Sequence, residues 1–357
     1  MLSPRPRSRP SPDFASGKPG VSAPEPRITA VSSGPSEPAI HRRRLGRLIA
    51  ALAGAGLTLL LLLIRGRTET DFDLLWYSAR HLLHGVDPYP LWHEHWKYPL
   101  YYPLTAVLVA VPFAALPLVV ARVAFNASVG AVLGAAFYGR ERWRWWTFAS
   151  GAYYFATLRA QPTPLLLAAV LIPMAAGLLV IKPNTGLTLF LAYPSRLAVL
   201  QGIALLAFSV ILLPRWPLEW LQAIRDSPVV ISPVRRPFGW LLLFSLLRWR
   251  DPRARLLAAL AVIPQNSFPH EANVLCLIPQ NAIEMAIFCV GTWMATVVTL
   301  VAHITEHSLE AAQSMVWPWL LGFVYLPSLW LVLRRPSLPS EGEVDALGGG
   351  KTPRGRA

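Results

Sequence analysis

Residues 65 to 103 read RGRTETDFDLLWYSARHLLHGVDPYPLWHEHWKYPLYYP and form the longest water-compatible interruption in an otherwise apolar sequence. Within this stretch, Thr70 to His84 carries apolar residues three, four and seven positions apart, which is typical of an amphipathic helix. Gly85 follows at the position of a C-terminal helix cap. A helix of this kind lies in a membrane interface and does not cross the bilayer. Its expected apolar face consists of Phe72, Leu75, Ala79, Leu82 and Leu83.

The composition of the whole chain is that of a membrane protein. Of its 357 residues, 54% are hydrophobic and 15% are charged, whereas a soluble domain is about one quarter charged. The mean hydropathy is +0.42, and apolar runs approach the roughly 20 residues that a helix needs to cross a bilayer. The formal net charge of +14 is spread over tails and short loops. We therefore expect contact with membrane lipid and no nucleic-acid partner.

The order of polar and apolar segments predicts three regions. Residues 1–44 are rich in Pro, Ser, Gly and Arg and are expected to form a disordered basic tail. Residues 45–334 are the expected transmembrane domain, which begins with a first span at 45–64. Residues 335–357 form a second disordered tail. By the positive-inside rule the N-terminal tail is cytoplasmic, so residues 65–103 are delivered to the outer face.

The remaining apolar segments predict an all-α polytopic membrane protein with about eight to ten transmembrane helices. Several segments are too short to span alone, so neighbouring pieces are expected to form kinked or re-entrant spans. The cluster Arg140 to Arg144 falls on the outer face in a simple count, against the positive-inside trend, so the topology of the middle region stays open. Cys276 and Cys289 form neither a disulfide framework nor a zinc spacing.

Two acidic residues, Asp71 and Asp73, are the first candidates for catalysis. A carboxylate beside a bilayer is costly unless it is used or solvated, and it can serve as a general base. The alternative is helix capping, since Thr70 with Asp73 three residues later fits a capping box. Capping accounts for Asp73 better than for Asp71.

Other polar residues are candidates for binding a phosphate or a substrate, namely Arg235, Arg236, Lys182, His270, Gln161 and Tyr102. An arginine pair can hold a phosphate with two hydrogen bonds, although loop arginines also contact lipid headgroups. His93, Glu94 and His95 do not have a zinc-site spacing, and we expect no metal. The chain lacks a P-loop and a dinucleotide-binding glycine pattern, so no cofactor is expected.

Four stretches together resemble family 87 of the glycosyltransferases, which are GT-C-type membrane enzymes related to polyprenyl-phosphate-mannose-dependent α-1,2-mannosyltransferases. The stretches are DFDLLWYSARHLLHGVDPY, YYPLTAVLVAVPFAALP, AQPTPLLLAAVL and LLVIKPNTGLTLF. The matching positions are Asp71-Phe72, Gly85 to Tyr89, Tyr102-Pro103, Ala160-Gln161 and Lys182-Pro183. The chain departs from the family pattern at Leu104, where a second proline is typical, and at Ala160, where a glycine is typical.

The resemblance implies a GT-C-like bundle and a polyprenyl-phosphate-linked sugar donor, with a mannose-like sugar. It implies a glycolipid or glycan acceptor at the outer face of a bacterial cytoplasmic membrane. It also places the general base at Asp71. Two other classes stay open: a transporter or flippase of a lipid-linked precursor, and a non-catalytic membrane scaffold in which the acidic residues only cap a helix.

Overall fold

The structure is a computed structural model that describes residues 37–63, 70–90, 99–225 and 230–335. Residues 43–335 of this described part belong to one compact unit. The α-helices are α1 Glu37–Leu63, α2 Asp71–Leu83, α4 Leu104–Ala110, α5 Leu118–Phe137, α6 Gly151–Leu158, α7 Thr163–Leu171, α8 Pro183–Ala192, α9 Arg196–Leu212, α10 Trp216–Arg225, α11 Pro252–Val262, α12 Ala282–Thr305, α13 Leu309–Leu320 and α14 Leu326–Leu333. The 3-10 helices are η1 Val111–Phe113, η2 Arg142–Ala149, η3 Pro173–Ile181, η4 Pro233–Arg235, η5 Gly239–Arg248 and η6 Glu271–Leu277, and η7 Leu321–Tyr325 is a π-helical turn.

The helices long and apolar enough to cross a membrane confirm the expected all-helical, polytopic membrane class. Within the described residues there are four such stretches, Ile40–Leu63, Leu118–Phe137, Ala282–Thr305 and Leu309–Leu333. The α9–α10 pair makes a fifth if its two helices, bent by 100°, are taken as one span. The first of the four stretches covers most of the predicted first span at 45–64. Its helix begins at Glu37, inside the predicted tail, while residues 1–36 and 336–357 lie outside the described residues.

The expected count of eight to ten spans exceeds this number. The difference arises in the middle of the chain, where prolines divide the apolar sequence into short helices. Pro162, Pro173 and Pro183 each stand at the start of a new helix (α7, η3 and α8). A proline has no amide hydrogen to donate and its ring clashes with the preceding turn, so proline kinks or ends a helix, and at these three positions one helix ends before the next begins.

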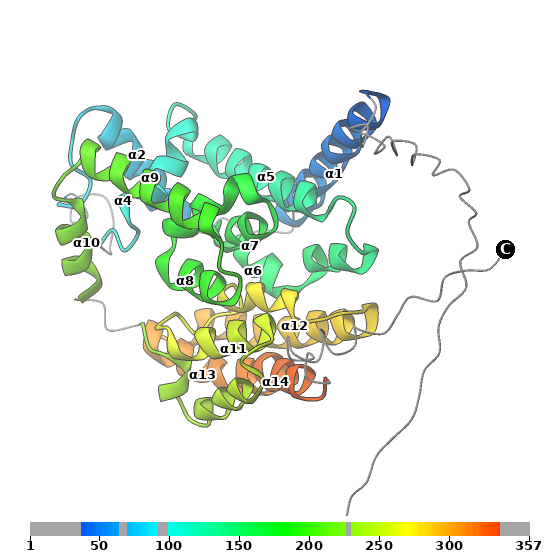
Figure 1. The fold of residues 1–357 in the computed structure, drawn as a ribbon. Helices are drawn as coiled ribbons and strands as arrows, with labels where there is room; N and C mark the ends of the chain where they lie inside the picture. Colours follow the sequence, from blue (N-terminus) through cyan, green and yellow to red (C-terminus); the bar gives the residue numbers. More distant parts are fainter. Residues whose placement is uncertain (1–36, 64–69, 91–98, 226–229, 336–357) are drawn as a thin grey trace, which may run out of the picture. The chain divides into compact units, whose positions relative to one another are not determined.

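Helix α2 forms where the sequence predicts it but is buried more completely than a one-sided interfacial helix. Phe72 and Ala79 are fully buried as expected, whereas Leu83, assigned to the same face, is 60% exposed. Trp76 is buried and its indole N–H points at the carbonyl oxygens of Phe113 and Leu116, each 3.2 Å away. The helix packs against α4, η1 and α5, and Figure 1 shows α2 beside α4.

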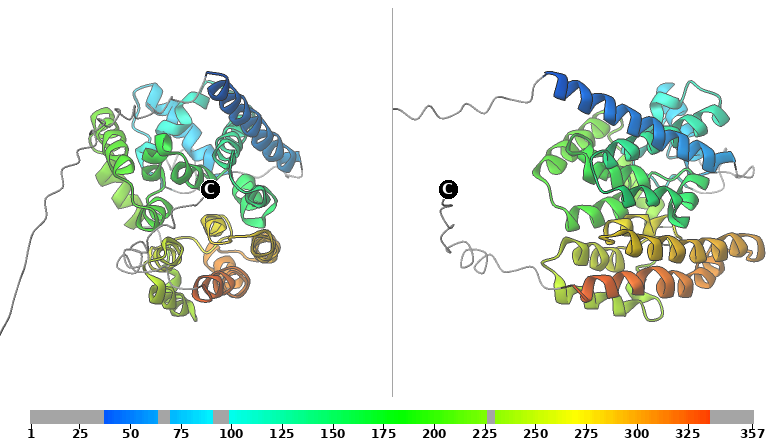
Figure 2. Two further views of the ribbon diagram at one scale, coloured as in Figure 1. Left: turned by 45° about the vertical axis from the view of Figure 1, so that its right-hand side comes forward. Right: turned by 90° about the vertical axis from the view of Figure 1, so that its right-hand side faces the viewer.

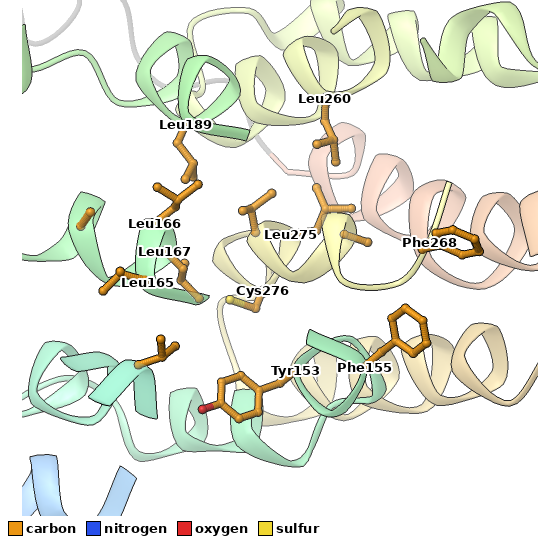
Figure 3. Close-up of a cluster of buried hydrophobic side chains, with 14 of the residues drawn as sticks. Tyr153, Phe155, Leu165, Leu166, Leu167, Leu189, Leu260, Phe268, Leu275 and Cys276 are labelled. Carbon is orange, nitrogen blue, oxygen red and sulfur yellow. The ribbon is translucent and has the colours of Figure 1, made fainter. Parts of the chain in front are cut away.

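The second half of the chain supplies a group of helices around α12. This helix packs against α13, α14 and α6, and the side view in Figure 2 shows α12 running alongside α13 and α14. Short helix η6 lies deep inside the unit, in contact with α6, α7, α8, α11 and α12. Figure 3 shows Leu275 on this helix and buried side chains of other segments near it, among them Leu166, Phe155 and Phe268. Any polar group on η6 is therefore held inside the protein.

Helix α1 approaches α5 through small residues. A side-chain carbon added at Gly54 would collide with the backbone of Gly130 and Gly134, and one added at Gly134 would collide with the backbone of Ala50. The Thr58 and Tyr153 hydroxyls are hydrogen-bonded at 2.6 Å, which ties α1 to α6. Small residues that allow two backbones to come this close are a common way of packing helices in membranes.

Candidate functional site

Asp71 stands at the first position of α2, and its carboxylate accepts hydrogen bonds from two side chains of the turn between α6 and α7. Oδ1 accepts a hydrogen bond from the Arg159 guanidinium at 3.1 Å, and Oδ2 accepts one from the Gln161 amide at 2.5 Å. The backbone N–H of Asp71 donates to the carbonyl of Arg159 at 3.1 Å. The side chain of Asp71 nevertheless stays 28% exposed. It is an oriented carboxylate that a ligand can still reach.

The turn between α6 and α7 brings Arg159 and Gln161 to the same carboxylate. Ala160, between them, has a φ of +48°, a left-handed conformation that a residue with a side chain seldom adopts. It reverses the chain before Pro162, so its two neighbours both reach Asp71. The resemblance noted above has glycine at this position, and glycine adopts this conformation without strain.

The Tyr102 hydroxyl joins Asp71 to the next part of the network. It lies 3.2 Å from Oδ2 of Asp71 and 3.2 Å from Oε1 of Gln161, so its single proton can serve either acceptor. Burial, followed by the negative charge of Asp71, raises the pKa of Tyr102 well above its usual value. Tyr102 therefore stays protonated at neutral pH and acts as a donor.

A buried ion pair lies on the other side of Gln161. The Lys182 ammonium, just before α8, donates to Oε1 of Gln161 at 3.1 Å and to the Thr163 hydroxyl at 3.2 Å. It also lies 2.8 Å from Oε1 of Glu271, whose side chain is fully buried. The second oxygen of Glu271 accepts a hydrogen bond from the Thr185 hydroxyl at 2.9 Å. A buried charge pair is tolerable only when its members are paired and hydrogen-bonded in this way.

His270 completes this buried cluster. Its Nε2 lies 3.5 Å from Oε1 of Glu271, and its ring stacks on Phe155 with the centroids 5.7 Å apart. Burial opposes ionisation of Glu271, but the charge and hydrogen bonding of Lys182 and His270 together outweigh it and hold the pKa of this carboxyl well below its usual range. Burial lowers the pKa of His270. At neutral pH the cluster therefore holds one ammonium, one carboxylate and a neutral imidazole.

Five of the residues singled out in the sequence thus meet in one connected network, namely Asp71, Tyr102, Gln161, Lys182 and His270. Sequence reasoning missed Arg159 and did not foresee the Lys182–Glu271 pair. The position of Arg159 next to the Ala160-Gln161 motif was an available signal. No signal in the sequence indicated the pairing of Lys182 with Glu271, because the two residues are brought together only by the fold.

Asp73 has a different environment. Its side chain is 1% exposed and is contacted by Nε and Nη2 of Arg122, each at 2.5 Å. It also accepts hydrogen bonds from the backbone N–H of Thr70 at 2.8 Å and from the Thr70 hydroxyl at 2.6 Å. These contacts occupy both oxygens. They account for Asp73 as the partner of Thr70 in a capping box at the start of α2, which is the alternative role that the sequence suggested.

The two predicted phosphate-binding arginines have no recorded contact with the Asp71 network. Arg235 is exposed, whereas Arg236 is buried and donates to Oε1 of Gln313 at 2.7 Å. The residues His93, Glu94 and His95 lie outside the described residues.

Fold and site together define an all-helical membrane protein with a partly exposed carboxylate connected to a buried charged cluster. Comparison with known proteins adds no identity to this description. No protein-family model, curated protein or solved structure matches the chain.

Proposed function

We propose that this protein is an integral-membrane glycosyltransferase with Asp71 as its general base. Its donor is a polyprenyl-phosphate-linked sugar of the mannose type, and its acceptor is a glycolipid or glycan of the cell envelope. The single observation that supports this most is the state of Asp71, a carboxylate oriented by Arg159 and Gln161 yet still 28% exposed. A general base needs this combination of fixed direction and access to the proton it removes.

In the proposed reaction, the acceptor hydroxyl approaches Asp71. A carboxylate oxygen takes the hydroxyl proton while the acceptor oxygen forms a bond to the anomeric carbon of the donor. The bond between that carbon and the phosphate oxygen breaks, and the polyprenyl phosphate leaves with the electron pair. The sugar is transferred with inversion. The partly exposed guanidinium of Arg159 lies at the site and favours the developing negative charge on the leaving phosphate.

We place the reaction at the outer face of a bacterial cytoplasmic membrane, with the N-terminus in the cytoplasm. The support is the excess of basic residues before the first span. Because α1 crosses once between that tail and α2, Asp71 then lies on the opposite side from the N-terminus.

One observation favours a second candidate, a transporter of a lipid-linked precursor. Lys182, Glu271 and His270 form a buried ionisable cluster in apolar surroundings, and such clusters often mark transport or proton pathways in membrane proteins. A transporter moves the intact donor across the membrane, whereas a transferase consumes it.

The decisive experiment measures sugar transfer in membranes supplied with radiolabelled polyprenyl-phosphate-mannose and a lipid extract. We compare the wild-type chain with Asp71→Asn and with the matched variant Asp73→Asn, and normalise each to its folded amount. Loss of a general base lowers the rate by roughly 100- to 10,000-fold, so we expect this loss for Asp71→Asn. Asp73→Asn is expected to lower the folded amount while the rate per folded molecule stays within a few-fold of wild type.

The outcomes separate the candidates. A transfer rate that is insensitive to Asp71→Asn contradicts the role of Asp71. Absence of transfer by the wild type across several lipid-linked sugars, together with movement of the intact donor across vesicles, favours the transporter. Absence of both activities favours the scaffold.

A further inference from the structure

Arg236 is a buried cation without a recorded counter-ion. The residue follows η4 and is 9% exposed. Its Nη2 donates to Oε1 of Gln313 at 2.7 Å. In the described part of the chain, its Nε has no hydrogen-bond partner and no carboxylate forms an ion pair with it. An unpaired buried charge is strongly unfavourable, so a missing anionic partner is the simplest account of it.

A second unsatisfied donor is tied to the same glutamine. Ser267 is 2% exposed, and its hydroxyl has no hydrogen-bond partner among the described residues. Its backbone N–H donates to Oε1 of Gln313 at 3.2 Å, the same oxygen that Arg236 contacts. Gln313 is fully buried on α13. The side-chain oxygen of Gln313 therefore holds Arg236 and Ser267 next to each other. The Nε of Arg236 and the hydroxyl of Ser267 are both left without a hydrogen-bond partner among the described residues.

The chemistry of this pair selects an oxyanion with several acceptor oxygens. A guanidinium presents N–H donors in a planar fork that suits phosphate, and a serine hydroxyl adds a further donor. Close by in the sequence, Phe238 is 67% exposed and Trp240 is 52% exposed, so exposed aromatic surface adjoins the arginine segment. This surrounding fits the phosphate of an amphiphile as well as a free phosphate.

We propose that Arg236 and Ser267, positioned by Gln313, form a binding site for a phosphate ester. The site is separate from the Asp71 network in its recorded contacts. The proposal does not depend on sugar transfer. Glu310, an exposed carboxylate on α13, acts electrostatically on Arg236 and competes with the ligand for its charge.

The test measures binding by calorimetry on the purified full chain, in a neutral detergent free of phospholipid. The probes are inorganic phosphate, decyl phosphate and the uncharged decanol. We expect Arg236→Gln to weaken phosphate-ester binding roughly 10- to 100-fold, the effect of losing a charge-assisted hydrogen bond. Ser267→Ala is expected to weaken it about 3- to 10-fold. Arg235→Gln, which removes the exposed neighbouring charge, serves as the matched control and is expected to leave binding unchanged.

Two further variants keep the test valid if Arg236→Gln misfolds. Arg236→Lys retains the charge but loses the planar fork, and we expect intermediate affinity. Glu310→Gln removes the competing carboxylate, and we expect tighter binding. Far-UV circular dichroism checks that each variant is folded.

The results decide between the sources of the phosphate and can overturn the site. Binding of decyl phosphate alone supports a lipid headgroup, and equal binding of decyl phosphate and inorganic phosphate supports a free phosphate. The proposal is overturned if the wild type binds neither, if decanol binds as tightly as decyl phosphate, or if Arg235→Gln weakens binding as much as Arg236→Gln. Since the binding assay contains no sugar acceptor, a negative binding result does not bear on the proposed transferase activity, which the sugar-transfer experiment tests separately.

Discussion

The left-handed backbone conformation of Ala160 is expected to lower the stability of the protein by a measurable amount. Adopting this conformation costs a residue with a side chain about 1 to 2 kcal/mol, whereas removing its buried methyl group loses about 0.8 kcal/mol. We expect Ala160→Gly to be neutral or to stabilise the protein by up to about 1 kcal/mol. Ala156→Gly, a matched change inside α6 where Ala156 is also fully buried, is expected to destabilise by about 1 kcal/mol or more. Thermal unfolding in detergent compares the two, and equal losses contradict the strain.

The buried pair of His270 and Glu271 predicts two separate acid transitions. The pKa of each group is lowered in the folded protein, so each stabilises the fold fully above its unfolded pKa and loses that contribution as the pH falls. The unfolded values are about 6.5 for histidine and about 4.3 for glutamate. The thermal stability of the wild type should therefore fall between about pH 7 and 5, and again below about pH 4.

Variants assign each transition to its residue. His270→Gln should flatten the first fall and Glu271→Gln the second, in the pH profile of the unfolding temperature. His84→Gln, at an exposed histidine, is the control and should leave the profile unchanged. A profile altered as much by His84→Gln as by His270→Gln contradicts the assignment.

Among helices, the α1–α5 contact depends on the absence of side chains. Gly134 meets the backbone of Ala50 and Gly54, so Gly134→Leu is expected to separate the two helices and destabilise the protein by about 1 to 3 kcal/mol. Gly56 lies on α1 with nothing close to it, and Gly56→Leu is expected to be neutral or slightly stabilising, because leucine favours helix more than glycine does. Thermal unfolding of both variants is the measurement. Similar losses contradict a close contact at Gly134.

Helix α2 shows which features of a helix local sequence signals predict and which they do not. Its start at Thr70 with Asp73, and its end before Gly85, follow from capping chemistry and were predicted correctly. The burial of α2 was not predicted. Arg122 on α5 is remote in the sequence, and nothing near it indicates that it pairs with Asp73. The same limit applies to Arg159 at Asp71. Caps depend on residues a few positions apart, whereas ion pairs depend on the fold.

At the scale of the whole molecule, the orientation in the membrane is open to a direct test. We expect residue 43 in the cytoplasm and residue 86 outside, because a single span lies between them. Cys276 and Cys289 are first replaced, and then Arg43→Cys or Val86→Cys is introduced, both at exposed positions. A membrane-impermeant maleimide should label the Val86→Cys protein in intact cells and the Arg43→Cys protein only after permeabilisation. The reverse pattern contradicts the orientation and the proposed outer-face site.

Composition and the first apolar run were sufficient to predict an all-helical membrane protein and its first span. They did not predict the number of spans, since hydropathy cannot tell whether a proline such as Pro173 only bends a helix or ends it. The GT-C-like bundle stays a prediction. Of the candidate site, the motif residues on the first half of the chain converged. The pairing of Lys182 with Glu271 joins two distant segments and was found only in the structure.

The glycine contact between α1 and α5 also has a consequence for biosynthesis. Gly130 is made 76 residues after Gly54, which is roughly 4 to 15 seconds at common elongation rates. During that interval the α5 contact of α1 cannot form, and the exposed leucine and isoleucine side chains of α1 suit a lipid environment. Its later packing against α5 requires only that the glycine-lined backbones of the two helices come into contact. Because of the order of translation, α1 is available as a membrane anchor before the helices that pack against it are made.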